Sequence, residues 1–223
     1  AGQGINLLDV GEKLADPGLS PAAYSRREEV LISAGIHPMM NKESELDRHL
    51  RLLEPFLENP EVRAIGECGL DLRSGMPLSV QTDLFAIQAV WGEKYRKPLI
   101  IHCVKAHDGI IAVAKKNHPT VPWIFHGYNN NEQILEQLLT HGFFIALGAA
   151  LLNKDSHAAR LIGKIPMEFL FLETDDREIP IHCIYKAACD ALNIPEEELK
   201  QRIFKNFERL FISTARGPNA SHK

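Results

Sequence analysis

The sequence lacks any apolar run that approaches the roughly 20 residues a membrane-spanning helix needs. It also lacks a basic-then-apolar leader, so we expect no export and no membrane partner. A basic excess is missing too, because the net charge is −4, which argues against indiscriminate nucleic-acid binding through overall charge. A local phosphate site is still allowed, since a bound cation adds positive charge where it is needed. These absences leave an ordinary globular protein.

Cysteine is scarce, and its spacing is not that of a zinc ribbon. The four residues are Cys68, Cys103, Cys183 and Cys189. They fall in predicted strands and helices, so we expect buried free thiols rather than ligands or disulfides. Free thiols fit a reducing compartment, and the predicted location is therefore cytoplasmic.

Short apolar runs alternate with amphipathic stretches along the whole chain. Continuous apolarity, rather than alternation, is typical of strands buried on both faces of a parallel sheet. The predicted strands are residues 5–10, 30–36, 64–70, 98–104, 123–128, 143–148 and 169–175.

Between these runs, apolar residues recur at helical spacing and predict one buried stripe per helix. The stretches are residues 46–57, 80–91, 134–139 and 199–210, and Gly142 is the expected C-terminal cap of the third. Strand, helix and strand in repetition predict right-handed crossovers and a parallel sheet.

The predicted fold class is α/β, a TIM-type (β/α) barrel formed by one domain over residues 1–214, with a flexible tail at 215–223. A closed barrel of this type has eight strands, and only seven apolar runs are found. Residues 11–21 contain glycines and prolines typical of a loop, where a further strand-helix unit would be expected. The barrel is therefore predicted to be incomplete or atypical at its first strand.

Four residues with imidazole or carboxylate side chains close four of the predicted strands. They are Glu67, His102, His126 and Asp175. In a parallel barrel such strand ends meet on one face, where active sites are built. Imidazole nitrogens and carboxylate oxygens converging there predict a site for a catalytic divalent metal.

Other residues allow more than one interpretation. Asp175 could hold metal, take a proton from an attacking water, or simply cap the helix that follows. His37 also closes a strand, and it suits either a metal or a substrate phosphate. Lys105 lies just past the His102 strand and could contact phosphate or sugar, although surface lysines are common.

Six stretches, taken in order, resemble the TatD family of metal-dependent hydrolases, in particular a compact bacterial branch. They include Ala-Ile-Gly-Glu-Cys-Gly-Leu-Asp and lie at residues 34–38, 64–71, 98–102, 126–128, 172–175 and 206–211. The resemblance implies an amidohydrolase-like barrel that binds one or two divalent cations (Mg, Mn or Zn) and hydrolyses phosphodiester bonds with metal-activated water.

DNA, or another phosphodiester, is the substrate class that this resemblance implies. Carried over by position, Glu67, His102, His126 and Asp175 are metal ligands. Glu67 and Asp175 are catalytic, and Asp175 lies near the attacking water. His37 and Lys105 are the substrate-binding candidates.

One departure from the family is the absence of its first-strand His-x-His, which supplies two metal ligands. Either residues 5–13 are the first strand, with Gly11 and Lys13 in place of the histidines, or they are the second and the first is not in this chain. In both cases one metal position should be weak or empty, and a lone three-ligand site can still be catalytic. Exposed strand edges would favour a homo-oligomer.

Three functions compete at this point. The first is a metal-dependent phosphodiesterase of the deoxyribonuclease type. The second is hydrolysis of a carboxylic ester, amide or lactone on the same barrel, because fold does not fix substrate. The third is a catalytically impaired member that binds a ligand or partner, and the missing His-x-His favours it.

Overall fold

The computed structural model describes residues 4–9, 30–39 and 43–212. The chain divides into two compact units, unit 1 (Ala1–Val121) and unit 2 (Pro122–Lys223), and each is treated by itself. The single domain over residues 1–214 stays a prediction. Both the tail at 215–223 and the loop at 11–21 lie outside the described residues.

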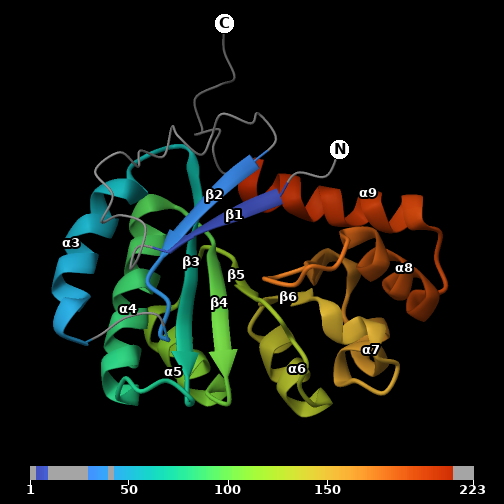
Figure 1. The fold of residues 1–223 in the computed structure, drawn as a ribbon, viewed down its shortest axis with the longest axis horizontal. Helices are drawn as coiled ribbons and strands as arrows, with labels where there is room; N and C mark the ends of the chain where they lie inside the picture. The colour runs from blue at the N-terminus through green and yellow to red at the C-terminus, as the bar shows by residue number, and fades with distance from the viewer. Residues whose placement is uncertain (1–3, 10–29, 40–42, 213–223) are drawn as a thin grey trace, which may run out of the picture. The chain divides into compact units, whose positions relative to one another are not determined.

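Unit 1 contains four parallel strands in the order β1-β2-β3-β4 (Figure 1). All four predicted strands of this part of the chain are confirmed. Because neighbours in sequence are neighbours in the sheet, each crossover connects adjacent strands. The parallel pairing of β1 with β2 fits both interpretations of residues 5–13. The strands are β1 (Gly4–Asp9), β2 (Val30–Gly35), β3 (Val62–Asp71) and β4 (Leu99–Val104).

In the described part of unit 1 the α-helices are α3 (Leu46–Leu57), α4 (Leu78–Tyr95) and α5 (His107–Asn117). The predicted apolar stripe of α3 is confirmed, since Leu53 and Leu57 are fully buried. Figure 1 shows α3 and α4 beside each other, and they contact β2 and β3. The helix α5 was not predicted.

Helix α4 differs from its prediction in which face is buried. Ile87, expected in the buried stripe, is 38% exposed, whereas Gln81 and Gln88 are buried. Leu84 and Trp91 are buried as expected. The apolar pattern alone misplaces the face because the amides hydrogen-bond to strand ends instead of facing water.

Unit 2 contains three further parallel strands, in the order β5-β6-β7. They are β5 (Trp123–Phe125), β6 (Phe144–Leu147) and β7 (Leu170–Leu172), and they confirm the three remaining predicted strands in shorter form. Aromatic rings fill the core beside them. The Trp123 and Phe143 rings stack with centroids 5.5 Å apart, and both residues are buried.

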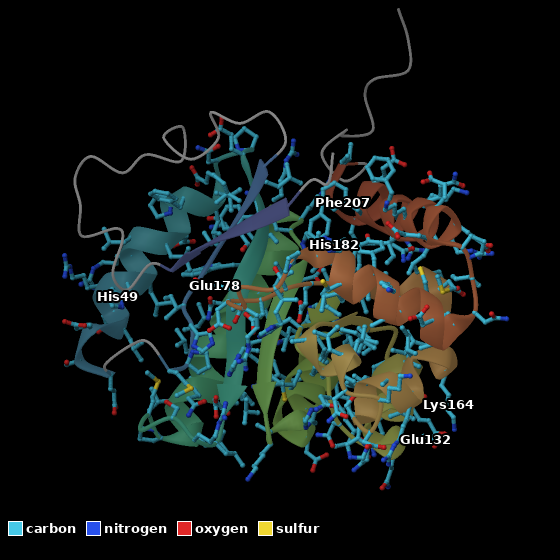
Figure 2. The ribbon with its side chains drawn as sticks, turned by 45° about the vertical axis from the view of Figure 1, so that its right-hand side comes forward. His49, Glu132, Lys164, Glu178, His182 and Phe207 are labelled. Atoms are coloured by element: carbon cyan, nitrogen blue, oxygen red, sulfur yellow. The ribbon has the colours of Figure 1, made fainter. Side chains whose placement is uncertain are left out.

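The α-helices of unit 2 are α6 (Glu132–Thr140), α7 (His157–Leu161), α8 (Ile181–Leu192) and α9 (Glu196–Phe207). The predicted helices at α6 and α9 are confirmed. Gly142 ends α6 with a left-handed φ of 74° and donates its N–H to the Leu139 carbonyl, as a C-terminal cap should. Figure 2 shows Glu132 of α6 beside Lys164, with which it forms an ion pair.

Among the residues that the structure describes there are five short helical turns, four of them 3₁₀ and the last a π turn. They are η1 (Glu43–Glu45), η2 (Ala149–Leu152), η3 (Ile162–Lys164), η4 (Met167–Phe169) and η5 (Glu208–Ile212). All four cysteines are free, Cys68 fully buried and the other three partly buried. Within the part of the chain that the structure describes, every helix is too short or too polar to cross a bilayer.

Glycine lets β3 approach β4 closely next to Glu67. Gly69 has a φ of +145°, and a methyl group added there would overlap the carbonyl oxygen of His102 and lie 2.9 Å from its carbon. Backbone atoms cannot move aside as a flexible side chain can, so only glycine fits this position.

We therefore expect Gly69→Ala to lower the free energy of unfolding by about 3 kcal/mol or more, through clash and backbone strain. The matched control is Gly75→Ala, because a methyl group there would meet no atom within 4 Å. The control should change stability by no more than about 1 kcal/mol. Urea unfolding of both variants measures the difference, and equal stabilities would contradict the close approach.

Candidate metal and phosphate site

Three side chains gather in the carboxyl-terminal halves of two strands of unit 1 and just beyond a third. Glu67 lies in β3, His102 in β4, and His37 two residues beyond β2. Each offers one ligand atom, and these atoms all lie within 4.8 Å of one another. Glu67 Oε2 is 3.5 Å from His37 Nε2 and 3.8 Å from His102 Nδ1. The sequence predicted Glu67 and His102 together, and the structure adds His37 to the pair.

A fourth residue, Asp71, orients the His102 ring through the nitrogen that faces away from Glu67. Its carboxylate is fully buried, and Oδ2 lies 2.9 Å from His102 Nε2. Burial raises the pKa of the Asp71 carboxyl, but hydrogen bonds from Arg73 and His102 outweigh it and hold the pKa at about 2. The carboxylate is therefore ionised at neutral pH and can only accept a hydrogen bond.

This hydrogen bond assigns the tautomer of His102. Because Asp71 accepts, the ring proton belongs on Nε2, and Nδ1 then carries the lone pair that faces Glu67. A carboxylate behind a histidine is the usual arrangement at metal sites, where it fixes the ring and makes the ligand nitrogen more basic.

His37 turns its other ring nitrogen, Nε2, toward Glu67. The backbone N–H of Met39 donates to His37 Nδ1 over 3.1 Å, so this nitrogen is the acceptor. In the neutral ring the proton must then be on Nε2, the atom that faces Glu67. His37 is thus suited to donate a hydrogen bond, and this favours the substrate-phosphate interpretation over the metal interpretation.

A divalent cation fits the Glu67 and His102 atoms. Ligand atoms about 2.1 Å from zinc lie about 3.4 Å apart in a tetrahedron and can be at most about 4.2 Å apart. The separation of 3.8 Å between Glu67 Oε2 and His102 Nδ1 falls within this range. An imidazole with one carboxylate suits zinc or manganese. The donor set is therefore compatible with the predicted cation.

Unit 2 contains the other two predicted ligands, and it brings them together. His126 follows β5, Asp175 follows β7, and each offers a ligand atom within 4.8 Å of the other. Asp175 is exposed, with a left-handed φ of 53°. It does not cap the next helix, because the N-cap of α8 is Pro180.

Glu173 supports His126 in unit 2. Its Oε1 accepts the N–H of Gly127 over 2.5 Å and lies 3.8 Å from His126 Nδ1. Sequence reasoning did not select Glu173 or Asp71, although both lie within four residues of a selected carboxylate. The signal was a second carboxylate near a strand end, and only tertiary contacts reveal which imidazole each one faces.

Lys105 lies directly after β4, exposed and with a left-handed φ of 54°. A β-carbon is strained in this region, and such strain in non-glycine residues is often found at functional sites. The neighbouring thiols are inert, because burial raises the pKa of Cys68 well above its usual range and that of Cys103 to about 12. Burial also lowers the pKa of His107, at the start of α5.

The assigned tautomer of His37 predicts that Glu67 is a metal ligand and His37 is not. In the full chain, stripped of metal by chelation, Glu67→Gln should weaken Mn²⁺ or Zn²⁺ binding by about 100-fold or more, because it removes a ligand oxygen. His37→Gln keeps a hydrogen-bond donor and should change the affinity by less than about fivefold. Titration calorimetry measures both. Equal losses would make His37 a ligand and contradict its assigned tautomer.

Comparison with known proteins assigns the chain to a family. The model of the "TatD related DNase" family matches residues 3–212. An uncharacterized metal-dependent hydrolase, YjjV of Escherichia coli, is 27% identical over 79% of this chain and 74% of its own length. The 3'-5' ssDNA/RNA exonuclease TatD of Edwardsiella piscicida is 30% identical over 64% of this chain, and the match spans 56% of that relative.

Solved structures agree on the fold. The crystal structure of the E. coli TatD homologue YjjV has a TM-score of 0.81 and 24% identity, covering 93% of this chain and 85% of its own. That of a TatD family hydrolase from Entamoeba histolytica has a TM-score of 0.75 and 17% identity, covering 94% and 85%. This likeness confirms the predicted class, an α/β fold of the TIM-barrel type. With the family model matching nearly the whole chain, this protein belongs to the TatD related DNase family.

Proposed function

We propose that this protein is a metal-dependent phosphodiesterase that hydrolyses nucleic acid, with single-stranded DNA or RNA as substrate. The observation that carries the proposal is the Glu67–His102–Asp71 arrangement, in which a lone pair on His102 Nδ1 faces a carboxylate 3.8 Å away. Membership of the TatD related DNase family supports the reaction class. The name of the E. piscicida relative supports single-stranded nucleic acid as the substrate.

In this proposal Glu67 and His102 hold a divalent cation (Mg, Mn or Zn), which when bound polarises a phosphoryl oxygen. Asp71 keeps the His102 ring in the tautomer that presents Nδ1. Glu67 and Nδ1 are mostly screened from water, since the side chains of Glu67 and His102 are 12% and 14% exposed. Low exposure strengthens the interaction of these residues with charge on the substrate.

His37 and Lys105 are proposed to bind the phosphate. His37 Nε2–H points into the same cluster as Glu67 Oε2, where it can donate to a non-bridging oxygen. The ammonium of Lys105 adds a positive charge to a chain whose overall charge is negative, so attraction of the substrate must be local.

His126 and Asp175 are proposed to be metal ligands within unit 2, where Glu173 lies beside His126. The exposed carboxylate of Asp175 is also proposed to take the proton from the attacking water, because general bases are often carboxylates within reach of a water. The cytoplasmic location and a homo-oligomer stay predictions, and the four free thiols support the first of these.

Activity provides the direct test. After chelation the full chain should not cleave single-stranded oligonucleotides or bis-p-nitrophenyl phosphate, and added Mn²⁺, Mg²⁺ or Zn²⁺ should restore cleavage. Glu67→Gln and His102→Ala should each lower kcat/KM by about 1000-fold or more, because both remove a group that acts on the reacting phosphate.

The matched control is Glu58→Gln, which changes an exposed carboxylate at the end of α3 and should leave kcat/KM unchanged. Cleavage that persists in Glu67→Gln and His102→Ala would rule the assignment out. Metal-dependent hydrolysis of carboxylic esters or lactones, with no cleavage of phosphodiesters, would instead favour an ester, amide or lactone hydrolase on the same barrel.

The strained backbone at Lys105 gives a second prediction. Lys105→Gly relieves the left-handed strain, so it should raise the free energy of unfolding by about 0.5–1 kcal/mol while it raises KM for an oligonucleotide. Arg96→Gly is the control, because Arg96 has the same φ of 54° at the end of α4. It should be stabilised similarly with KM unchanged. If KM rose equally in both variants, Lys105 would not be a substrate-binding residue.

A further inference from the structure

Helix α4 buries two glutamine side chains on the face that packs against the strands of unit 1. Gln81 is 1% exposed and Gln88 is 0% exposed. They lie seven residues apart, nearly two helical turns, so they point to the same side. An amide buried without hydrogen-bond partners is strongly destabilising. The partners of these two amides therefore indicate what they do.

Gln88 forms hydrogen bonds with both peptide groups of Ile36. Its Oε1 accepts the Ile36 N–H over 2.7 Å, and its Nε2 donates to the Ile36 carbonyl over 3.2 Å. Ile36 directly follows β2 and directly precedes His37. The paired bonds therefore fix the main chain one residue before the ring that faces Glu67.

Gln81 makes the same pair of bonds with Asp71. Its Oε1 accepts the Asp71 N–H over 2.8 Å, and its Nε2 donates to the Asp71 carbonyl over 3.1 Å. Nε2 also donates to the carbonyl of Met76 over 2.7 Å. Asp71 is the residue whose carboxylate holds His102 Nε2. Gln81 therefore fixes the main chain from which the His102 ring is oriented.

A side-chain amide presents an N–H donor beside a carbonyl acceptor, so it can pair with the N–H and the C=O of one residue as a neighbouring strand does. The pairing of β2 with β3 reaches Ala34 and Ile65, which leaves Ile36 beyond it. Beyond the end of the β2–β3 pairing, Gln88 bonds the main chain that follows β2, and Gln81 bonds the main chain at the end of β3. Ser74 Oγ also donates to the Pro38 carbonyl over 2.8 Å, which joins the loops after β3 and β2.

We propose that Gln81 and Gln88 are positioning residues that set two halves of the site separately, an inference that rests on the proposed function. Gln81 sets the metal-binding half through Asp71 and His102. Gln88 sets the phosphate-binding half through His37. Neither amide touches the cluster itself, so each acts through the main chain that it holds.

The test compares Gln81→Met and Gln88→Met with Leu84→Ala in the full chain. Methionine is close to glutamine in size but cannot form the paired hydrogen bonds. Leu84 lies between the glutamines on the same helix face and is buried, so its truncation removes packing alone. Three quantities are measured: the urea midpoint, the Mn²⁺ affinity after chelation, and the ring NMR signals of His37 and His102 without metal.

Gln81→Met should shift the His102 signals and weaken Mn²⁺ binding about tenfold or more, as loss of an outer partner of a ligand does. Gln88→Met should shift the His37 signals and raise KM for bis-p-nitrophenyl phosphate about fivefold or more, with Mn²⁺ affinity within about threefold of the wild type. Leu84→Ala should lower the urea midpoint and leave the ring signals, the affinity and KM unchanged.

Midpoints lowered as in Leu84→Ala, with ring signals and Mn²⁺ affinity unchanged in both methionine variants, would overturn the inference. If the ring signals shift as expected but the wild type binds no cation, the proposed function fails while the placing of the rings by the glutamines stands. Should Gln88→Met not fold, Gln88→Glu keeps the acceptor for the Ile36 N–H. Its His37 signals should then shift, and unchanged signals would overturn the role of Gln88.

Discussion

The candidate site depends on one buried hydrogen bond, between the Asp71 carboxylate and the His102 ring, 2.9 Å apart. Asp71 is fully buried, and a buried carboxylate is stable only when its oxygens are paired. Arg73 and His102 provide that pairing and keep the group ionised, with a pKa of about 2. Because the anion can only accept, it directs the His102 proton to Nε2 and leaves Nδ1 facing Glu67. One buried charge thus determines which atom is available to a cation.

The rest of unit 1 holds this hydrogen bond in place. Gly69 allows β3 to pass against the His102 peptide, and no larger residue fits there. Gln81 holds the main chain of Asp71, and Gln88 does the same before His37. Helix α4 thus serves as a scaffold for two strand ends as well as a cover for the sheet. This explains why two polar residues occupy its buried face while Ile87 is exposed.

Much of the fold follows from the local pattern of apolar residues, but the buried face of helix α4 does not. Seven continuous apolar runs predicted seven strands, and all seven form in the described part of the chain. The stripe of α3 was predicted correctly because its buried positions, apart from His49, are leucines. The buried face of α4 was not, because hydropathy treats Gln81 and Gln88 as surface residues. Their burial is stabilised by hydrogen bonds to residues 52 and 10 positions away in sequence, and a helical hydropathy pattern contains neither partner.

The sequence by itself determined the seven strands and the parallel sheet, because apolar runs are local features. It also selected Glu67, His102, His126 and Asp175, but it placed Glu67 at the end of a strand that in fact continues to Asp71. Only the tertiary structure decided which nitrogen of each histidine carries the proton. Asp71 and the Met39 N–H both place the ring proton on Nε2, but His102 turns its lone-pair nitrogen Nδ1 toward Glu67, whereas His37 turns its Nε2–H toward the same carboxylate. Two histidines that look equivalent in sequence therefore differ in chemistry, since a ring nitrogen is a ligand or a donor according to the hydrogen bond that the other nitrogen makes.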